Sequence, residues 1–194
     1  MCILLLAFPA FASPALEKLF GFVTMAGEAM GSLADGIEKS FNTGTRIYDD
    51  LSIREEKERL LDLSANLSHL GMIQTEFVGT LEEFNARPDV EKWEKLAENS
   101  RMISEDVRSL IAHLKAERSP LVTKGEAYDA LLLTLQHRGT TITEFQKIQL
   151  PLTADDLDTL KKIEATYSVL LTNLYRAKES LNTYIEQRFE DLKP

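Results

Sequence analysis

The three histidines of this chain, His69, His113 and His137, are the first side chains to consider for chemistry, because imidazole is the commonest metal ligand in proteins. Metal centres in helical bundles use a Glu-x-x-His motif on two helices, but asparagine, leucine and threonine stand three residues before these histidines. The sequence has no His-Glu-x-x-His motif, and its single cysteine excludes a Cys-x-x-Cys-His haem attachment. We therefore predict no metal ion and no cofactor.

The sequence also lacks the common nucleophile and phosphate-binding motifs. It contains no Gly-x-Ser-x-Gly, no serine three residues before a lysine, and no glycine-rich run ahead of a helix. The adjacent carboxylates Asp49-Asp50 and Asp155-Asp156 stand at expected helix entries, where helix capping and the helix dipole explain them. We therefore predict that the protein is not an enzyme.

One polar cluster is a candidate ligand pocket. It consists of a cation and two hydroxyls around a glycine, in the run His137, Arg138, Gly139, Thr140 and Thr141. A helix kinked at this glycine could open a small site for an anion. The competing interpretation is local unwinding that lets the Arg138 guanidinium reach water.

Any such site must be positioned by helices, because apolar residues recur in alternating steps of three and four along most of the chain. Asn42-Thr43-Gly44 ends the first such segment, Asp89 offers a cap for the third, and Thr153 offers a cap for the last. Gln74 and Ser100 are polar interruptions that could fix the register of packing. The apolar seams of the predicted helices cover residues 16–37, 60–84, 93–114, 121–145 and 160–184, and the last helix is expected to run from the Thr153 cap essentially to the end of the chain.

These segments predict an all-α protein, since no sustained alternation typical of β-strands is present. Short connections between successive helices favour antiparallel neighbours. We expect an elongated antiparallel helical bundle of four to five long helices with heptad-type packing, in which the first helix lies alongside the others. Residues 13–194 would form a single domain.

The N-terminal residues 1–12 resemble a cleaved signal peptide. The apolar run from Cys2 to Phe11 is too short to span a bilayer, and the small residues Ala10 and Ala12 satisfy the pattern that precedes signal cleavage. No basic residue precedes Ile3, which leaves open an upstream start and the alternative of a buried N-terminal segment. We expect a periplasmic or secreted protein.

The formal net charge of −9 disfavours nucleic acid and anionic membrane surfaces as partners, and it favours a basic or neutral partner. The charges are interspersed, as in the run of alternating charges at residues 54–59, which we interpret as a solvated helix face. Heptad segments also fit a homo-oligomer as well as a monomer.

The first predicted helix differs from the others because residues 19–30 contain only one charge, that of Glu28. Its small residues are spaced so that another helix can approach closely. The candidate helix-packing or docking face consists of Phe20, Gly27, Gly31 and Ala34. It could pack inside the bundle, or it could detach and dock on a partner or on lipid.

The sequence thus favours a non-catalytic extracytoplasmic helical-bundle protein that binds another protein through an exposed helical face, as adaptors, inhibitors, immunity proteins and chaperone-like proteins do. One alternative is a small-ligand sensor or carrier with its pocket near His137 and Arg138. Another is binding to a membrane surface through the first helix.

Overall fold

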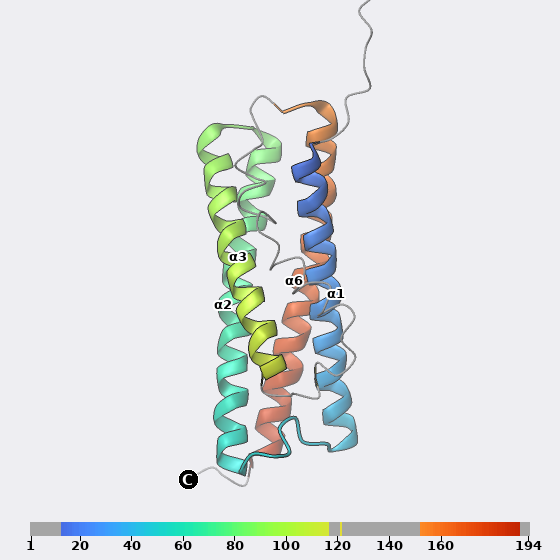
Figure 1. The fold of residues 1–194 in the computed structure, drawn as a ribbon, viewed down its shortest axis with the longest axis vertical. Coiled ribbons are helices and arrows are strands. Elements are labelled where there is room, and N and C mark those ends of the chain that lie inside the picture. The colour runs from blue at the N-terminus through green and yellow to red at the C-terminus, as the bar shows by residue number, and fades with distance from the viewer. Residues whose placement is uncertain (1–12, 117–120, 122–151, 191–194) are drawn as a thin grey trace, which may run out of the picture.

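The computed structural model describes residues 13–116, 121 and 152–190, and it shows a bundle of long helices (Figure 1). The helices are α1 (Pro14–Thr43), α2 (Ile53–Ala86), α3 (Val90–Ala116) and α6 (Ala154–Arg188). No β-strand occurs within these residues. The predicted all-α helical bundle is confirmed, whereas the helix predicted at residues 121–145 falls, apart from Leu121, outside the described residues.

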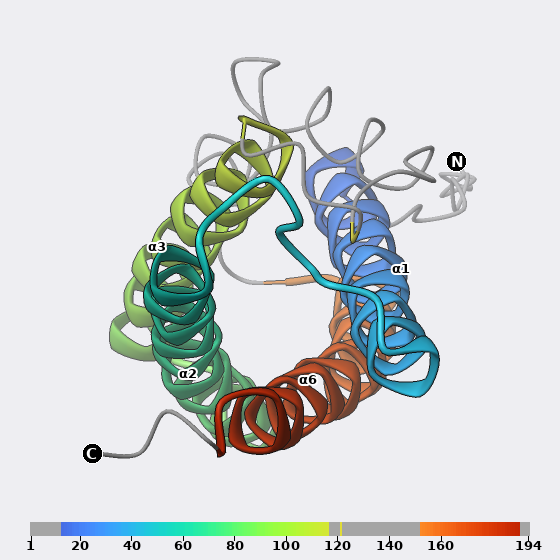
Figure 2. The same cartoon turned by 90° about the horizontal axis from the view of Figure 1, so that it is seen from below.

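The four helices form a curved row in the order α1, α6, α2 and α3 (Figure 2). Helices α1 and α6 run parallel, as two hydrogen bonds between them show. Ser13 at the start of α1 bonds to Asp156 at the start of α6, and Thr45 after the end of α1 bonds to Tyr184 near the end of α6. Helix α2 runs antiparallel to α6, as the bond between Asn85 and Glu164 at one end of the pair shows. The parallel pair therefore brings two helix N-termini together at one end of the bundle.

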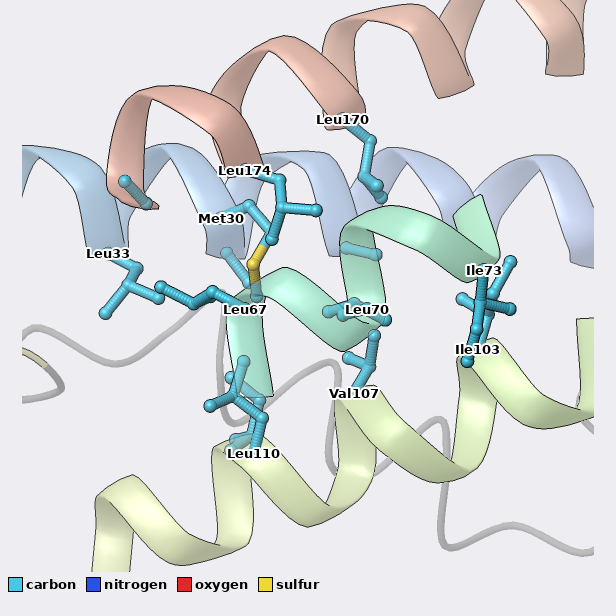
Figure 3. Close-up of a cluster of buried hydrophobic side chains, with 14 of the residues drawn as sticks. Met30, Leu33, Leu67, Leu70, Ile73, Ile103, Val107, Leu110, Leu170 and Leu174 are labelled. Atoms are coloured by element: carbon cyan, nitrogen blue, oxygen red, sulfur yellow. The ribbon is translucent and has the colours of Figure 1, made fainter. Parts of the chain in front are cut away.

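The hydrophobic core follows the heptad positions read from the sequence. Met30 of α1, Leu67 of α2 and Leu174 of α6 point toward one another and are fully buried (Figure 3). All eight apolar residues that the heptad spacing assigns to the last helix are buried: Leu160, Ile163, Tyr167, Leu170, Leu174, Ala177, Leu181 and Tyr184. The 3.5-residue period in the sequence therefore identifies the interior face of each described helix.

Three predicted helix ends are confirmed by their caps. Gly44 closes α1 with a φ angle of 65°, in the left-handed region that glycine adopts without strain. The Asp89 carboxylate accepts a hydrogen bond from the Lys92 backbone N–H at 2.8 Å. The Thr153 hydroxyl accepts one from the Asp156 N–H at 3.1 Å, so both residues cap as expected.

The buried carboxylate of Glu56 corrects one interpretation of the sequence, and it lies at the end of the bundle opposite to the N-termini of α1 and α6. Glu56 belongs to the charged run 54–59 that we expected to be solvated, but its side chain is 0% exposed. It lies 2.8 Å from Arg46 Nε and 4.0 Å from Arg188 Nε. Burial, and then the charge of Glu56, raise the pKa of Tyr184, whose hydroxyl lies 3.4 Å from Glu56 Oε1. Glu56 thus joins the α1–α2 connection, the start of α2 and the end of α6.

Candidate functional site

The two groups of site residues proposed from the sequence have different outcomes. The candidate pocket residues His137, Arg138, Thr140 and Thr141 lie outside the described residues. The sensor or carrier interpretation therefore stays a prediction.

The second group, on α1, lies in the contact with α6. A Cβ atom on Gly27 would lie 3.7 Å from Leu170 Cβ, and the Gly27 carbonyl accepts a hydrogen bond from Asn173 Nδ2 at 3.1 Å. A Cβ on Gly31 would lie 3.2 Å from the same Asn173 nitrogen. Ala34 is fully buried and Phe20 is half-buried against the core. In this structure α6 occupies the small-residue face of α1, so an exposed docking surface has to be found on other helices.

Such a surface lies on the outer side of the α2–α6 contact. Met72 is 66% exposed and Tyr175 is 48% exposed, and they are two of the six large apolar side chains exposed within the described residues. The Tyr175 hydroxyl lies 3.1 Å from Thr75 Oγ1, so the two helices meet at this point. We call this surface the α2–α6 face, defined by Ser68, Met72, Thr75 and Gly79 of α2 and by Ser168, Val169, Thr172 and Tyr175 of α6.

The α2–α6 face carries no Asp, Glu, Lys or Arg. Residues 63–75 of α2 and 165–175 of α6 contain none of these four residue types, although 27% of the chain is charged. Because α2 and α6 are antiparallel, these two stretches meet where Thr75 contacts Tyr175 and then diverge, with Ser64 beside Asn182 and Asn85 beside Glu164. Surface helices normally expose charged residues, whereas the central part of a protein interface is depleted of them and enriched in tyrosine and methionine. The eight residues that define the face are thus of the types found at the centre of interfaces, with charged residues such as Glu76 and Arg176 next to them.

Gly79 adds a second unusual feature to the α2–α6 face. It lies inside a 34-residue helix, and a Cβ atom added to it would meet no atom within 4 Å. Glycine in a helix interior costs about 1 kcal/mol relative to alanine. Gly71 differs, because a Cβ there would lie 3.3 Å from Leu174 Cδ2 beneath Tyr175. Packing within the described residues accounts for Gly71 but not for Gly79, whose missing side chain would let another backbone approach α2 closely.

We expect Gly79→Ala to raise the free energy of unfolding by about 0.5 to 1 kcal/mol, because alanine favours the helix and meets open space. Gly71→Ala is the matched control, since its new methyl group would press on Leu174 and offset the gain. Urea denaturation of both variants measures the difference. Loss of stability in Gly79→Ala would show that this position has a packing role that the structure lacks.

A cavity of about 370 Å³ lies between the end of α1 and the C-terminal half of α6. It is lined by Glu38, Phe41 and Asn42 of α1 and by Glu179, Ser180 and Thr183 of α6. None of these residues belongs to the α2–α6 face, but Glu179 follows Tyr175 of that face by one helical turn.

The chemistry of this cavity suits a cation. Glu38 lies 3.1 Å from Arg176 Nε and accepts a hydrogen bond from the Ser180 hydroxyl at 3.3 Å. Glu179 has no ion-pair partner within the described part of the chain. The last turn of α1 contains no basic residue to offset the negative end of its helix dipole. Two carboxylates and the aromatic ring of Phe41 could together receive a lysine or arginine side chain.

A smaller cavity between α2 and α3 contains a histidine–carboxylate pair. His69 Nδ1 lies 3.0 Å from Asp106 Oδ2, and Asn66 and Ser109 also line this cavity. The residue types resemble a hydrolytic triad, but the cavity of about 50 Å³ has room for only a few water molecules. The pair joins α2 to α3.

The described residues offer neither a metal site nor a membrane span. Within 13–116, 121 and 152–190, no three His, Cys, Asp or Glu side chains gather closely enough to hold a metal ion. None of the four described helices has an apolar stretch long enough to cross a bilayer.

Comparison with known proteins adds no assignment. No protein-family model, no curated protein and no solved structure matches this chain. The functional argument therefore starts from the α2–α6 face and the cavity between α1 and α6.

Proposed function

We propose that this protein is a non-catalytic, extracytoplasmic helical-bundle protein that binds another protein through the α2–α6 face. The observation that carries the proposal is the exposure of Met72 and Tyr175 among the eight uncharged residues that define this face. The sequence pattern of residues 1–12 supports export. An adaptor, an inhibitor or a chaperone-like protein would use such a surface without performing a reaction.

The charges around the face favour a basic partner. Glu82 and Glu83 follow its α2 side, and Glu179 stands beyond Tyr175 on its α6 side, next to the acidic cavity. Lys178 is a basic neighbour of Glu179, but the chain as a whole carries a net charge of −9. The partner that fits best is a helix whose apolar side covers Met72 and Tyr175 and whose lysine or arginine reaches the Glu179 cavity. A second copy of this chain fits less well, because its own glutamates would approach these carboxylates.

Affinity capture from the native extracytoplasmic fraction tests the proposal. The wild-type protein should recover one stoichiometric partner, identified by mass spectrometry. Met72→Glu and Tyr175→Glu should each weaken the binding of that partner at least tenfold, because they place a charge inside a desolvated contact. The matched control is Val90→Glu, which changes another exposed apolar residue, at 59% exposure, at the start of α3.

The control separates a specific surface from a general effect of added charge. Equal binding by the wild type, Met72→Glu and Tyr175→Glu would reject the α2–α6 face as the binding surface. Equal losses in Met72→Glu and Val90→Glu would show that net charge, and not the face, determines binding. Glu179→Gln tests whether the cavity binds a cation of the partner. The substitution should weaken the binding of the partner less at high salt than at low salt, because salt already screens the attraction.

A further inference from the structure

The starts of α1 and α6 are linked by one carboxylate. The backbone nitrogen of Ser13 donates a hydrogen bond of 2.7 Å to Asp156 Oδ1. The other oxygen, Oδ2, accepts bonds from the Thr153 N–H at 3.0 Å and from the Thr153 hydroxyl at 2.7 Å. Asp156 is only 6% exposed. Each oxygen of this buried carboxylate therefore accepts hydrogen bonds at the N-terminal end of a different helix, Oδ1 at α1 and Oδ2 at α6.

The Asp156 carboxylate is charged at neutral pH. Burial acts to raise its pKa, but the hydrogen bonds from Ser13 and Thr153 outweigh burial and hold the pKa below its ordinary value. The parallel arrangement of α1 and α6 also brings two positive helix-dipole ends to this point, and a negative charge complements both. The other charged residues in the first five positions of the two helices are Glu17, Lys18, Asp155 and Asp158, and the backbone N–H of Glu17 donates to the Ser13 carbonyl at 3.2 Å.

Ser13 is also the first residue after the expected signal cleavage. Ala12 and Ala10 have the small side chains that signal peptidase accepts, and cleavage after Ala12 would leave Ser13 as the new N-terminus. The nitrogen that donates to Asp156 is thus the nitrogen that cleavage would convert into an α-amino group.

We infer that cleavage between Ala12 and Ser13 is a maturation step that converts this hydrogen bond into an ion pair, locking α1 onto α6. Water hydrolyses the peptide bond, its oxygen stays on the Ala12 carboxylate, and the Ser13 nitrogen leaves as an amine that gains a proton. The resulting ammonium group lies beside Asp156 without any movement of the helix, because Ser13 already caps α1 through its side chain. This inference depends on the export part of the proposed function and not on the α2–α6 face.

The maturation step predicts that Asp156 stabilises the cleaved chain more than the uncleaved chain. The charged carboxylate already accepts this hydrogen bond before cleavage, and cleavage adds the attraction between opposite charges, so we expect Asp156→Asn to reduce the folding equilibrium constant about tenfold more in the cleaved chain. The measurement is urea denaturation of the exported, cleaved protein and of the full uncleaved chain produced without export. Asp155→Asn is the matched control, because Asp155 neighbours Asp156 on the same turn but is exposed.

A second measurement does not require the uncleaved chain to fold. Mass spectrometry of the exported protein should give an N-terminus at Ser13, and NMR titration should give its α-amino group a pKa above the usual value of about 7.7 to 8.0. Asp156→Asn should return that pKa to the usual range, and Asp155→Asn should leave it raised.

The inference fails if the exported protein starts at another residue, or if Asp156→Asn has the same effect on the cleaved and uncleaved chains. An ordinary α-amino pKa in a chain that starts at Ser13 would also reject it. None of these outcomes affects the binding of a partner by Met72 and Tyr175, which affinity capture measures separately. If affinity capture recovers no partner but the α-amino pKa of Ser13 is raised, the binding function is rejected and the ion pair with Asp156 is supported.

Discussion

Replacing Arg46 with methionine is expected to lower the free energy of unfolding by about 3 kcal/mol, the largest effect that we predict for a single substitution. Arg46 Nε lies 2.8 Å from the carboxylate of Glu56, which is 0% exposed, and the groups left near that carboxylate would be Arg188 at 4.0 Å and the uncharged Tyr184 hydroxyl at 3.4 Å. Removing one partner of a buried ion pair leaves a desolvated charge without compensation. The Arg46 guanidinium also donates to the Leu51 carbonyl at 2.6 Å, so the α1–α2 connection would loosen as well. Urea denaturation at neutral pH measures the loss.

The matched control for this prediction is Arg54→Met. The Arg54 side chain is 90% exposed in its pair with Glu58, and an exposed pair contributes less than about 1 kcal/mol. Glu56→Gln should partly rescue Arg46→Met, because the double variant buries no charge. If Arg46→Met lowers the free energy of unfolding as little as Arg54→Met does, the buried pair of Arg46 and Glu56 does not stabilise the fold as we predict.

Replacing Gly27 with leucine is expected to destabilise the bundle by about 1 to 3 kcal/mol through overpacking. A Cβ at this position already comes within 3.7 Å of Leu170 Cβ, so alanine fits there but a longer side chain would push α1 away from α6. Gly21→Leu is the control on the same helix, because a Cβ on Gly21 meets no atom within 4 Å. Thermal or urea denaturation of the two variants gives the comparison.

The same pair of variants tests whether helix α1 acts on membranes. A helix that detached to bind lipid would keep its affinity for vesicles in Gly27→Leu, and easier detachment would increase that affinity. In the structure, by contrast, the small-residue face of α1 is covered by α6. Equal stability of Gly27→Leu and Gly21→Leu would contradict the close α1–α6 contact.

Much of the fold follows from the sequence because its information is local and periodic. The heptad spacing identifies buried residues such as Leu170 and Leu174, and single residues such as Gly44 and Thr153 mark the helix ends. Gln74 is buried at its predicted seam position. Each of these inferences depends only on residues within a few helical turns.

The remaining features depend on contacts between residues far apart in the chain. In the sequence Glu56 cannot be distinguished from its exposed charged neighbours. Its burial depends on contacts with Arg46 and Tyr184, which the fold brings close to it. The α2–α6 face likewise arises only when Thr75 meets Tyr175, 100 residues away in the sequence. Uncharged stretches in two helices could have indicated a shared surface, but the sequence alone does not show that the two helices are neighbours.

The most direct test of the central claim is photo-crosslinking from the α2–α6 face in the native extracytoplasmic environment. A photoreactive amino acid at position 72 should give one discrete adduct with a single protein, and the same amino acid at position 90 of α3 should give none. Both positions are exposed, at 66% and 59%, so accessibility does not distinguish them. The absence of an adduct from position 72, or the same adduct from both positions, would contradict binding through the α2–α6 face.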